Sequence, residues 1–464
     1  MPSTLDAASQ RSYLPPMLTV DAALARLSQA IDHAKRRGAD AADAIYVGDA
    51  STSVQVRLGE LEDIGRSEGE EIGLRLFVGR RSASVSTSDL SARAIETAVE
   101  RAFAMAREAP DDPYAGLAPD DRLLRGAAPD LDLFDGDELS AEALKDRAIE
   151  AEDAARAVAG VTNSEGASAS VGGATIALAT SGGFAGGYAT SSNGLSASVI
   201  AGERAGMQRD YAFHAARYAA DLDGPADIGT LAGRRAVVRL NPRKLDTGQM
   251  PIIFDPRVGS SLLGYLLGAI TGGAVTRGTS FLLDRLGTKI FADGIHILDD
   301  PHRRRGLRSR PFDGEGLPTG PTAIVDDGVL TTWLLDSAAA RQLALAPTGH
   351  ALRGISGPPG AGPSNLHMAA GTISRDAILR DIKHGFYVTE LIGQGLNPVT
   401  GDYSRGAAGF LIDSGVIGPA VAEVTIAGNV KDMFLNLTPA DDLEFRHATN
   451  VPTIRIDGLT VAGA

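Results

Sequence analysis

Histidine and cysteine are the first residue types to test for chemistry, because they supply many metal ligands, general bases and nucleophiles. Eight histidines are present, and no two stand at the spacing that places a pair of metal ligands on one helical face. The closest pair, His296 and His302, flanks Asp299-Asp300-Pro301 in a predicted loop. The chain has no cysteine, which excludes disulfides, a catalytic thiol and thiolate ligands. The sequence therefore predicts no metal site in this chain.

Two further patterns suggest chemistry but lack the structural setting that it needs. Gly65-Arg66-Ser67-Glu68-Gly69 matches the G-x-S-x-G pattern of hydrolases, which requires a strand–turn–helix elbow. It lies between two predicted strands, so no nucleophile is predicted there. The basic run Arg303–Arg310 could contact nucleic acid or an acidic partner, but the net charge of the chain is −14. We therefore expect a solvated loop at this run and no nucleic-acid binding.

The polar segment Asp402-Tyr403-Ser404-Arg405 is the best candidate site in the chain, and glycines stand on both sides of it. One interpretation is a structural turn held by an Asp–Arg pair. The other is the lining of a binding cleft. Both interpretations stay open at this point.

The elements that must position these residues begin with a pattern that occurs twice. A helix, four strand-like runs and a second helix are followed by the same order again. We interpret the two sets as related α+β layers that could form one sheet system. The helices are predicted at Thr19–Arg36, Ser88–Arg107, Ser140–Ala157 and Asp227–Arg239, and the strands at Ala42–Val47, Ser53–Leu61, Glu71–Val78, Ser82–Ser86, Val161–Ser170, Ala174–Thr180, Gly186–Ala201 and Met207–Phe213.

The character of the chain changes near Pro251. Pro251–Phe254 predicts a short strand and Asp255–Ile270 an apolar helix, and most of the remainder alternates strands with glycine-marked turns. Asp413-Ser414-Gly415 falls between two apolar runs, where a hairpin turn is expected. The predicted fold class is therefore α+β. It comprises an N-terminal α+β domain at residues 1–240 and a β-rich C-terminal domain at residues 241–464.

The predicted helix after Pro251 also has to be tested as a membrane span. Gly264, Gly268 and Gly272 repeat the GxxxG spacing of paired membrane helices. The charge-free run contains too many glycine, serine and threonine residues for a good span, and no second span exists, so no membrane association is predicted. Glycines four apart share one helical face, and we expect leucine at Gly268 to overpack it. Met1–Met17 is polar, contains prolines and has no apolar signal core.

Two segments of the C-terminal half carry a family resemblance. Thr400–Phe410 and Glu423–Asn429 closely resemble the C-terminal domain of the TldD/PmbA family. The resemblance covers most of the chain and points to the PmbA (TldE) branch, once called a modulator of DNA gyrase. It implies a cytoplasmic heterodimeric peptidase in which the TldD-type chain carries the zinc.

The same resemblance implies that the zinc ligands are missing from this chain. In TldD-type chains the helix equivalent to Asp255–Ile270 carries a His-Glu-x-x-x-His motif, whose histidines hold zinc and whose glutamate is the general base. The alignment places Gly264 and Ala269 at the histidines and Tyr265 at the glutamate. The third family ligand is a cysteine, and this chain has none.

The sequence therefore predicts a non-catalytic subunit of a zinc peptidase that acts on unfolded or precursor peptides. No catalytic residue and no cofactor are expected in this chain, and zinc is expected in a TldD-like partner. Gly268 and the residues Asp402, Tyr403, Ser404 and Arg405 would line the cleft for peptide or partner. Homodimers of the isolated chain are also compatible with the sequence.

Two alternative functions remain open at this stage. One is an independent hydrolase with a site built from Tyr403, Ser404 and His350. The other is a regulatory binding protein, a gyrase modulator as the older family name says. Peptide cleavage by the purified chain would favour the first alternative, and gyrase binding without a peptidase partner the second.

Overall fold

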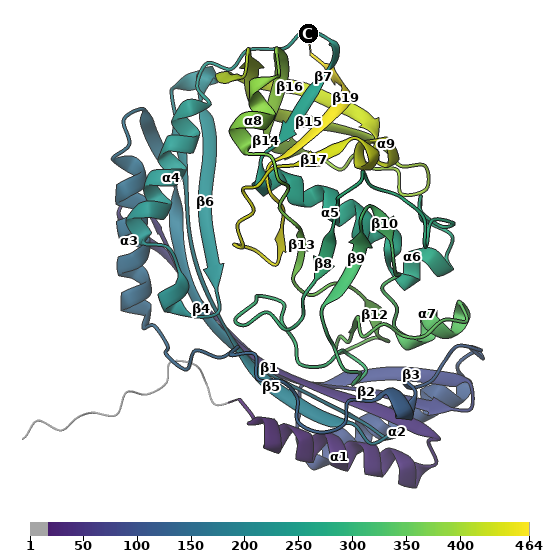
Figure 1. The fold of residues 1–464 in the computed structure, drawn as a ribbon. Coiled ribbons are helices and arrows are strands. Elements are labelled where there is room, and N and C mark those ends of the chain that lie inside the picture. The colour runs from purple at the N-terminus through teal and green to yellow at the C-terminus, as the bar shows by residue number, and fades with distance from the viewer. Residues whose placement is uncertain (1–16, 464) are drawn as a thin grey trace, which may run out of the picture.

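The first half of the chain forms one curved antiparallel sheet of six strands, in the order β3-β2-β1-β4-β5-β6 (Figure 1). A computed structural model describes residues 17–463. Residues 1–16 and residue 464 lie outside the described residues. The prediction that the N-terminal segment has no signal core therefore also falls outside them. The strands are β1 (Ala41–Arg57), β2 (Glu60–Val78), β3 (Arg81–Thr87), β4 (Val161–Thr180), β5 (Ala185–Ala201) and β6 (Gln208–Ala216).

Each half of this sheet has three strands, so the prediction of four strands per unit is wrong, whereas the α+β class is confirmed. The predicted run before residues 48–52 and the first part of the run after them belong to the single strand β1, and Ser53–Leu61 continues through the turn at Leu58-Gly59 into β2. The runs on either side of residues 171–173 belong to β4. The small and polar residues in these two gaps indicated turns. In the structure the gaps pair with each other across the middle of the sheet, for example Ala50 with Gly173. The pairing of β1 with β4 satisfies the backbone hydrogen bonds of both gaps. Strand propensity is judged from neighbouring residues alone and cannot detect a partner that is distant in sequence.

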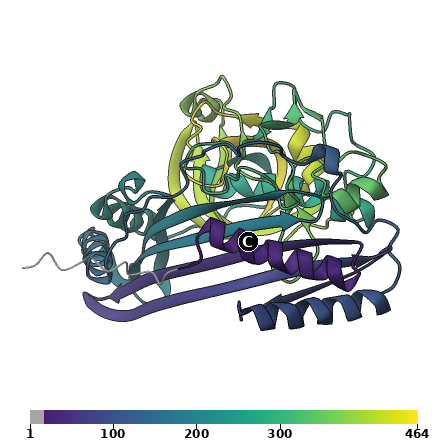
Figure 2. The same ribbon diagram turned by 90° about the horizontal axis from the view of Figure 1, so that it is seen from below.

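Four helices cover the convex face of the sheet, as Figures 1 and 2 show from two directions. Thr19, Ser91 and Ser140 each cap a helix by accepting a hydrogen bond from the amide three residues later. One helix pair packs over one end of the sheet and the other pair over the opposite end, giving two separate apolar cores. The helices are α1 (Val20–Arg37), α2 (Ala92–Glu108), α3 (Ala141–Arg156) and α4 (Pro225–Val238).

The second half of the chain lies inside the curve of the first sheet (Figure 1). One of its sheets closes into a ring, because β16 pairs with both β15 and β19. The ring and its extra strand are β7 (Gly248–Phe254), β14 (His384–Ile392), β15 (Asp402–Asp413), β16 (Val416–Asn429), β19 (Ile454–Ala462) and β17 (Leu437–Pro439). The smaller sheets are built from β8 (Ile297–Asp299), β9 (Thr322–Asp326), β10 (Val329–Leu330), β11 (Ala351–Leu352), β12 (Gly360–Ala361), β13 (Leu366–Met368) and β18 (Thr449–Asn450). The helices are α5 (Pro256–Ile270), α6 (Gly272–Thr276), α7 (Ser337–Gln342), α8 (Arg375–Arg380) and α9 (Val430–Leu435).

The two halves meet through side chains and loops, and no strand between residues 17 and 463 pairs across them. Ile45 and Leu178 of the first sheet share a small core with Phe312 and Leu317. Gly73 of β2 lies so close to the opposite half that an added Cβ would stand 2.0 Å from a backbone carbonyl oxygen there. The domain boundary at residues 240 and 241 stays a prediction about which parts fold independently.

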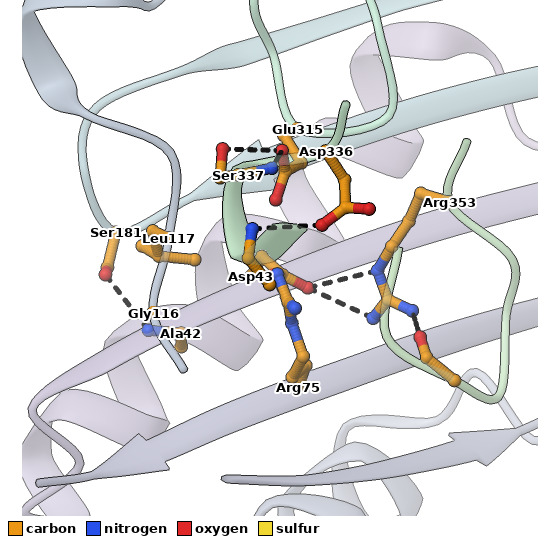
Figure 3. A network of polar contacts seen from close by, with 12 residues as sticks. Ala42, Asp43, Arg75, Gly116, Leu117, Ser181, Glu315, Asp336, Ser337 and Arg353 are labelled. Carbon is orange, nitrogen blue, oxygen red and sulfur yellow. Dashed lines mark hydrogen bonds and ion pairs between the residues drawn. The ribbon is translucent and has the colours of Figure 1, made fainter. Parts of the chain in front are cut away.

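Buried charges also join the two halves, as Figure 3 shows. Asp43 on β1 accepts hydrogen bonds from Arg75 Nε at 2.7 Å and from Arg353 Nη2 at 3.0 Å. Arg353 lies just after β11, 310 residues further along the chain. Nearby, Glu315 accepts hydrogen bonds from the amide and the hydroxyl of Ser337, at 2.8 and 2.6 Å. Asp43 therefore has two guanidinium partners that compensate its burial, whereas Glu315 has hydrogen-bond donors but no ion-pair partner among residues 17–463.

Candidate functional site

Helix α5 carries the positions where the family resemblance places zinc ligands. Asp255 caps its first turn by accepting a hydrogen bond from the Arg257 amide at 3.1 Å. Its apolar face is buried in the core of the C-terminal half, while Gly264 and Gly268 on the opposite face are exposed. No helix between residues 17 and 463 is both long enough and apolar enough to cross a membrane.

The residues at the three degenerate positions do not fit a zinc ion. Gly264 and Ala269 have no donor atoms in their side chains, and Ala269 is also buried. The hydroxyl of Tyr265 accepts a hydrogen bond from Arg405 Nη1 at 3.1 Å, and a guanidinium at this position repels a cation. No cluster of three or more His, Asp or Glu residues suited to a metal occurs in the part of the chain that the structure describes.

The glycine face of α5 is open rather than packed. A Cβ added at Gly264 or Gly268 would have no heavy atom within 4 Å among residues 17–463. An added Cβ at Gly268 therefore finds open space among the described residues, and the expectation that leucine would overpack the fold has no support at this atom. Gly272 differs, because an added Cβ would stand 2.5 Å from the Cβ of Ala339 in α7. Of these three glycines, Gly264 and Gly268 leave the helix backbone uncovered and Gly272 does not.

The polar segment Asp402–Arg405 is the start of strand β15 and not a turn. Side chains alternate across a strand, so Tyr403 and Arg405 share one face and approach α5, while Asp402 and Ser404 are exposed on the other. Asp402 bonds to Thr400 and Asn429, not to Arg405. The four predicted cleft residues therefore divide into two pairs, and only one pair lies beside α5.

Tyr403 and Tyr265 pack edge to face, with ring centroids 5.7 Å apart. Tyr403 is only 2% exposed, and its hydroxyl has no hydrogen-bond partner among the described residues. Burial raises the pKa of Tyr403, so the phenol stays protonated across the physiological range. The Tyr265 hydroxyl holds Arg405 in position, and the protonated phenol of Tyr403 offers no general base.

A cavity of about 370 Å³ lies next to Arg405, between the two halves of the chain. It is formed where the start of β6, the end of α4, the first turns of α5 and the end of β14 meet. The lining residues are Arg209, Asp210, Tyr211, Arg239, Arg257, Val258, Ser261, Thr389, Glu390, Leu391 and Arg405. Arg257, Ser261, Gly264 and Gly268 follow the spacing of one helical face, so the open glycine face continues the cavity wall.

Asp210 organises the charges on one side of this cavity. It is 3% exposed and pairs with Arg257 at 2.9 Å and with Arg239 at 3.3 Å. Burial alone would oppose its ionisation, but the charge and hydrogen bonds of Arg257, aided by Arg239, outweigh burial and hold the pKa of Asp210 below its ordinary value. Arg239 also pairs with Glu390. Two arginines and two carboxylates therefore neutralise one another here.

His350 belongs to a different part of the structure from Tyr403 and Ser404. It is buried, with Nδ1 3.0 Å from Thr348 Oγ1 and Nε2 3.5 Å from Asp299 Oδ2. No contact among the described residues joins His350 to the other two, so the hydrolase site suggested as an alternative is not assembled.

The basic run Arg303–Arg310 is held by contacts and is not simply solvated. Arg304 and Arg305 both pair with Asp132, at 3.1 and 2.7 Å. Arg303 lies over the ring of Phe445, and Arg310 is buried and donates to a backbone carbonyl. The expectation of a solvated loop therefore holds for Arg304, Arg305 and Arg308, which are exposed, but not for Arg310, which is buried.

Three family models match successive parts of the chain. They are the PmbA/TldA metallopeptidase domain 1 at residues 42–106, the central domain at 134–240 and the C-terminal domain at 247–463. The chain belongs to the PmbA/TldD family. The resemblance stated from Thr400–Phe410 and Glu423–Asn429 is confirmed, and the family is one of metallopeptidases by name.

A PmbA protein and two solved structures are similar to this chain over nearly its whole length. The metalloprotease PmbA of Escherichia coli O157:H7 is 40% identical over 442 residues, covering 94% of this chain and 96% of that one. A Bacteroides thetaiotaomicron protein, described as a suspected modulator of DNA gyrase, has 27% identity and a TM-score of 0.89, covering 97% and 100% of the two chains. TldE from Thermococcus kodakarensis shares the fold, with a TM-score of 0.84 at 21% identity and coverage of 94% and 100%.

Sequence reasoning found Arg405 and missed the rest of the cavity. Arg257 and Ser261 share the face of the predicted glycine helix, so helical periodicity could have found them. Asp210 and Thr389 come from strands that meet α5 only in the folded chain, and no sequence signal links them to it.

Proposed function

We propose that this member of the PmbA/TldD family is the non-catalytic subunit of a heterodimeric zinc metallopeptidase. A TldD-like partner supplies the zinc and the general base, and the pair acts in the cytoplasm on unfolded or precursor peptides. The observation that carries the proposal is the pairing of Tyr265 with Arg405, at the positions where a catalytic chain needs a metal-activated water. A guanidinium there is incompatible with binding a cation in this chain.

The open face of α5 supports the partner half of the proposal. Each glycine in a helix costs about 1 kcal/mol relative to alanine. Gly264 and Gly268 have no packing reason for their small size within residues 17–463. A closely approaching partner or peptide backbone supplies such a reason, because any larger side chain would keep it at a distance.

Metal content and reconstitution test the proposal together. The purified chain should hold well under one zinc per molecule and cleave no peptide alone, while a mixture with a TldD-like chain should cleave unfolded peptides. Tightly held stoichiometric zinc, or cleavage by this chain alone, would overturn the proposal and favour an independent hydrolase.

A leucine scan of open glycines tests the role of α5. Gly268→Leu should leave the chain folded and lower cleavage by the mixed pair by roughly tenfold, the loss expected for one well-packed contact. Gly206→Leu is the matched control, because an added Cβ at Gly206 also meets nothing within 4 Å. Equal activity of the two variants would remove α5 from the interface.

A further inference from the structure

Unpaired polar atoms concentrate around the cavity beside Arg405. The described residues contain eight enclosed side-chain nitrogen or oxygen atoms with no hydrogen-bond partner. Arg257 Nε, Thr389 Oγ1 and Arg405 Nε belong to residues that line this cavity, and Tyr403, whose hydroxyl is the fourth such atom, shares the face of β15 with Arg405. Half of the unsatisfied atoms are therefore at one place. Such groups are costly in a folded protein unless a bound molecule compensates them.

Arg405 differs in charge balance from the other three arginines of the cavity. Arg239 and Arg257 share the carboxylate of Asp210, and Arg209 pairs with Glu165 at 3.4 Å. Arg405 has no carboxylate partner among residues 17–463, and its one hydrogen bond goes to the neutral hydroxyl of Tyr265. The other three arginines are each paired, Arg257 also with Asp255 at 3.8 Å and Arg239 also with Glu390. Arg405 is therefore the one guanidinium of the cavity without a carboxylate partner among the described residues, and the Tyr265 hydroxyl holds it in position.

The ligand that fits this charge is a monoanion with planar oxygen acceptors. A guanidinium binds a carboxylate through two parallel hydrogen bonds, and such charge-assisted bonds are about twice as strong as neutral ones. Thr389 and Ser261 border the same wall, although the Thr389 hydroxyl oxygen is enclosed and the Ser261 hydroxyl donates to the Val258 carbonyl at 2.7 Å. A volume of about 370 Å³ accommodates a short peptide segment rather than a single small ion.

We propose that the cavity binds a carboxylate of the peptide substrate, either its C-terminal group or an acidic side chain, through Arg405. This inference rests on the proposed function for the identity of the substrate, but not for the binding chemistry. The exposed ring of Tyr211 borders the cavity, and the bare backbone of Gly264 and Gly268 extends its wall along α5. A peptide anchored at Arg405 can therefore run along the open face of the helix.

Binding to the isolated full-length chain is the deciding measurement. The probes are a fluorescent unstructured peptide with a free C terminus, the same peptide as its C-terminal amide, and the amide with glutamate replacing one glutamine. The wild-type chain should bind a carboxylate-bearing probe about tenfold more tightly than the neutral amide. Comparison of the free acid with the glutamate-containing amide then identifies which carboxylate is preferred.

Three variants assign the effect to Arg405. Arg405→Met should lower the affinity for the preferred acid to that of the neutral amide and leave amide binding unchanged, and Arg405→Lys should restore part of the difference. Tyr265→Phe retains the charge but frees the guanidinium, so it should reduce the preference less than Arg405→Met does. Arg66→Met is the matched control, because Arg66 is an exposed arginine on β2.

Several outcomes would overturn the carboxylate site. For the wild type, these outcomes are equal binding of the acid and the neutral amide, or no binding of any probe. For Arg405→Met, they are an equal loss of acid and amide binding, or a loss of binding to the partner chain with peptide binding unchanged. The last outcome would assign the charge of Arg405 to the subunit interface. If Arg405→Met does not fold, Arg405→Lys and Thr389→Val decide by the same ratio. If the mixed pair cleaves peptides but does not distinguish the acid from the amide, the carboxylate site is refuted and the proposed subunit function stands. If the chain shows Arg405-dependent binding but activates no TldD-like partner, the carboxylate site stands and the subunit function is refuted.

Discussion

The charged cluster around Asp43 and the cavity beside Arg405 both lie between the two halves of the chain, yet their hydrogen bonding differs. Around Asp43, two guanidinium groups bind one buried carboxylate, and Glu315 accepts two hydrogen bonds from Ser337 (Figure 3). Around Arg405, donors remain without partners and a cavity separates the elements.

This difference separates a structural contact from a binding site. A saturated network has no hydrogen-bonding capacity left for a ligand, and its removal exposes buried charges to one another. An unsaturated network costs stability in the free chain and recovers it when a ligand arrives. We therefore expect substitutions at Asp43 to change mainly stability and substitutions at Arg405 to change mainly binding.

The largest effect is expected for Asp43→Asn. The substitution leaves Arg75 and Arg353 buried without their shared carboxylate, which should lower the free energy of unfolding by about 3–5 kcal/mol. Urea unfolding of the full chain measures this. Asp111→Asn, which removes an exposed partner of Arg81, should leave the unfolding curve unchanged. A small effect at Asp43 would mean that this cluster is not what fixes the two halves together.

The pH dependence of stability should reveal Glu315. Burial raises the pKa of Glu315 to about 7 from an ordinary value of 4.5. Between these two values the folded chain binds a proton that the unfolded chain has released, so the contribution of Glu315 to stability falls as pH rises from about 4.5 to about 7. Glu315→Gln should remove this decline, which we expect to be about 1–3 kcal/mol. If the free energy of unfolding of the wild type and of Glu315→Gln changes in parallel between about pH 4.5 and 7, the assignment of this decline to Glu315 is refuted.

The smallest effects come from adding one methyl group in each region. Gly73→Ala places a Cβ 2.0 Å from the backbone oxygen of Ile355, so the two halves must shift, and we expect a loss of about 1–3 kcal/mol. Gly268→Ala meets no atom within 4 Å and should stabilise the isolated chain by up to about 1 kcal/mol through helix propensity. Thermal unfolding of both variants measures the contrast. Stabilisation by Gly73→Ala would refute the close approach of the two halves.

Local sequence determined the elements whose signals are contained within a few residues. The turn residues Ser414-Gly415 have positive φ and join the predicted hairpin of β15 and β16, and Asp327-Gly328 do the same for β9 and β10. Helix α5 was predicted at Asp255–Ile270 and spans Pro256–Ile270, with Asp255 as its N-cap. The absence of metal-ligating side chains at Gly264 and Ala269 also follows from the sequence once the family is recognised.

Tertiary structure decided where distant residues meet. The gaps that divided the predicted strands became continuous β1 and β4, because each gap found the other as its hydrogen-bonding partner. The segment Asp402–Arg405 was predicted as one site, but strand alternation sends only Tyr403 and Arg405 toward α5. The cavity needs residues from β6, α4, α5 and β14, and no local signal encodes their meeting. Hydrogen-bond capacity is a property of each residue, whereas its satisfaction depends on which residues the fold brings within reach.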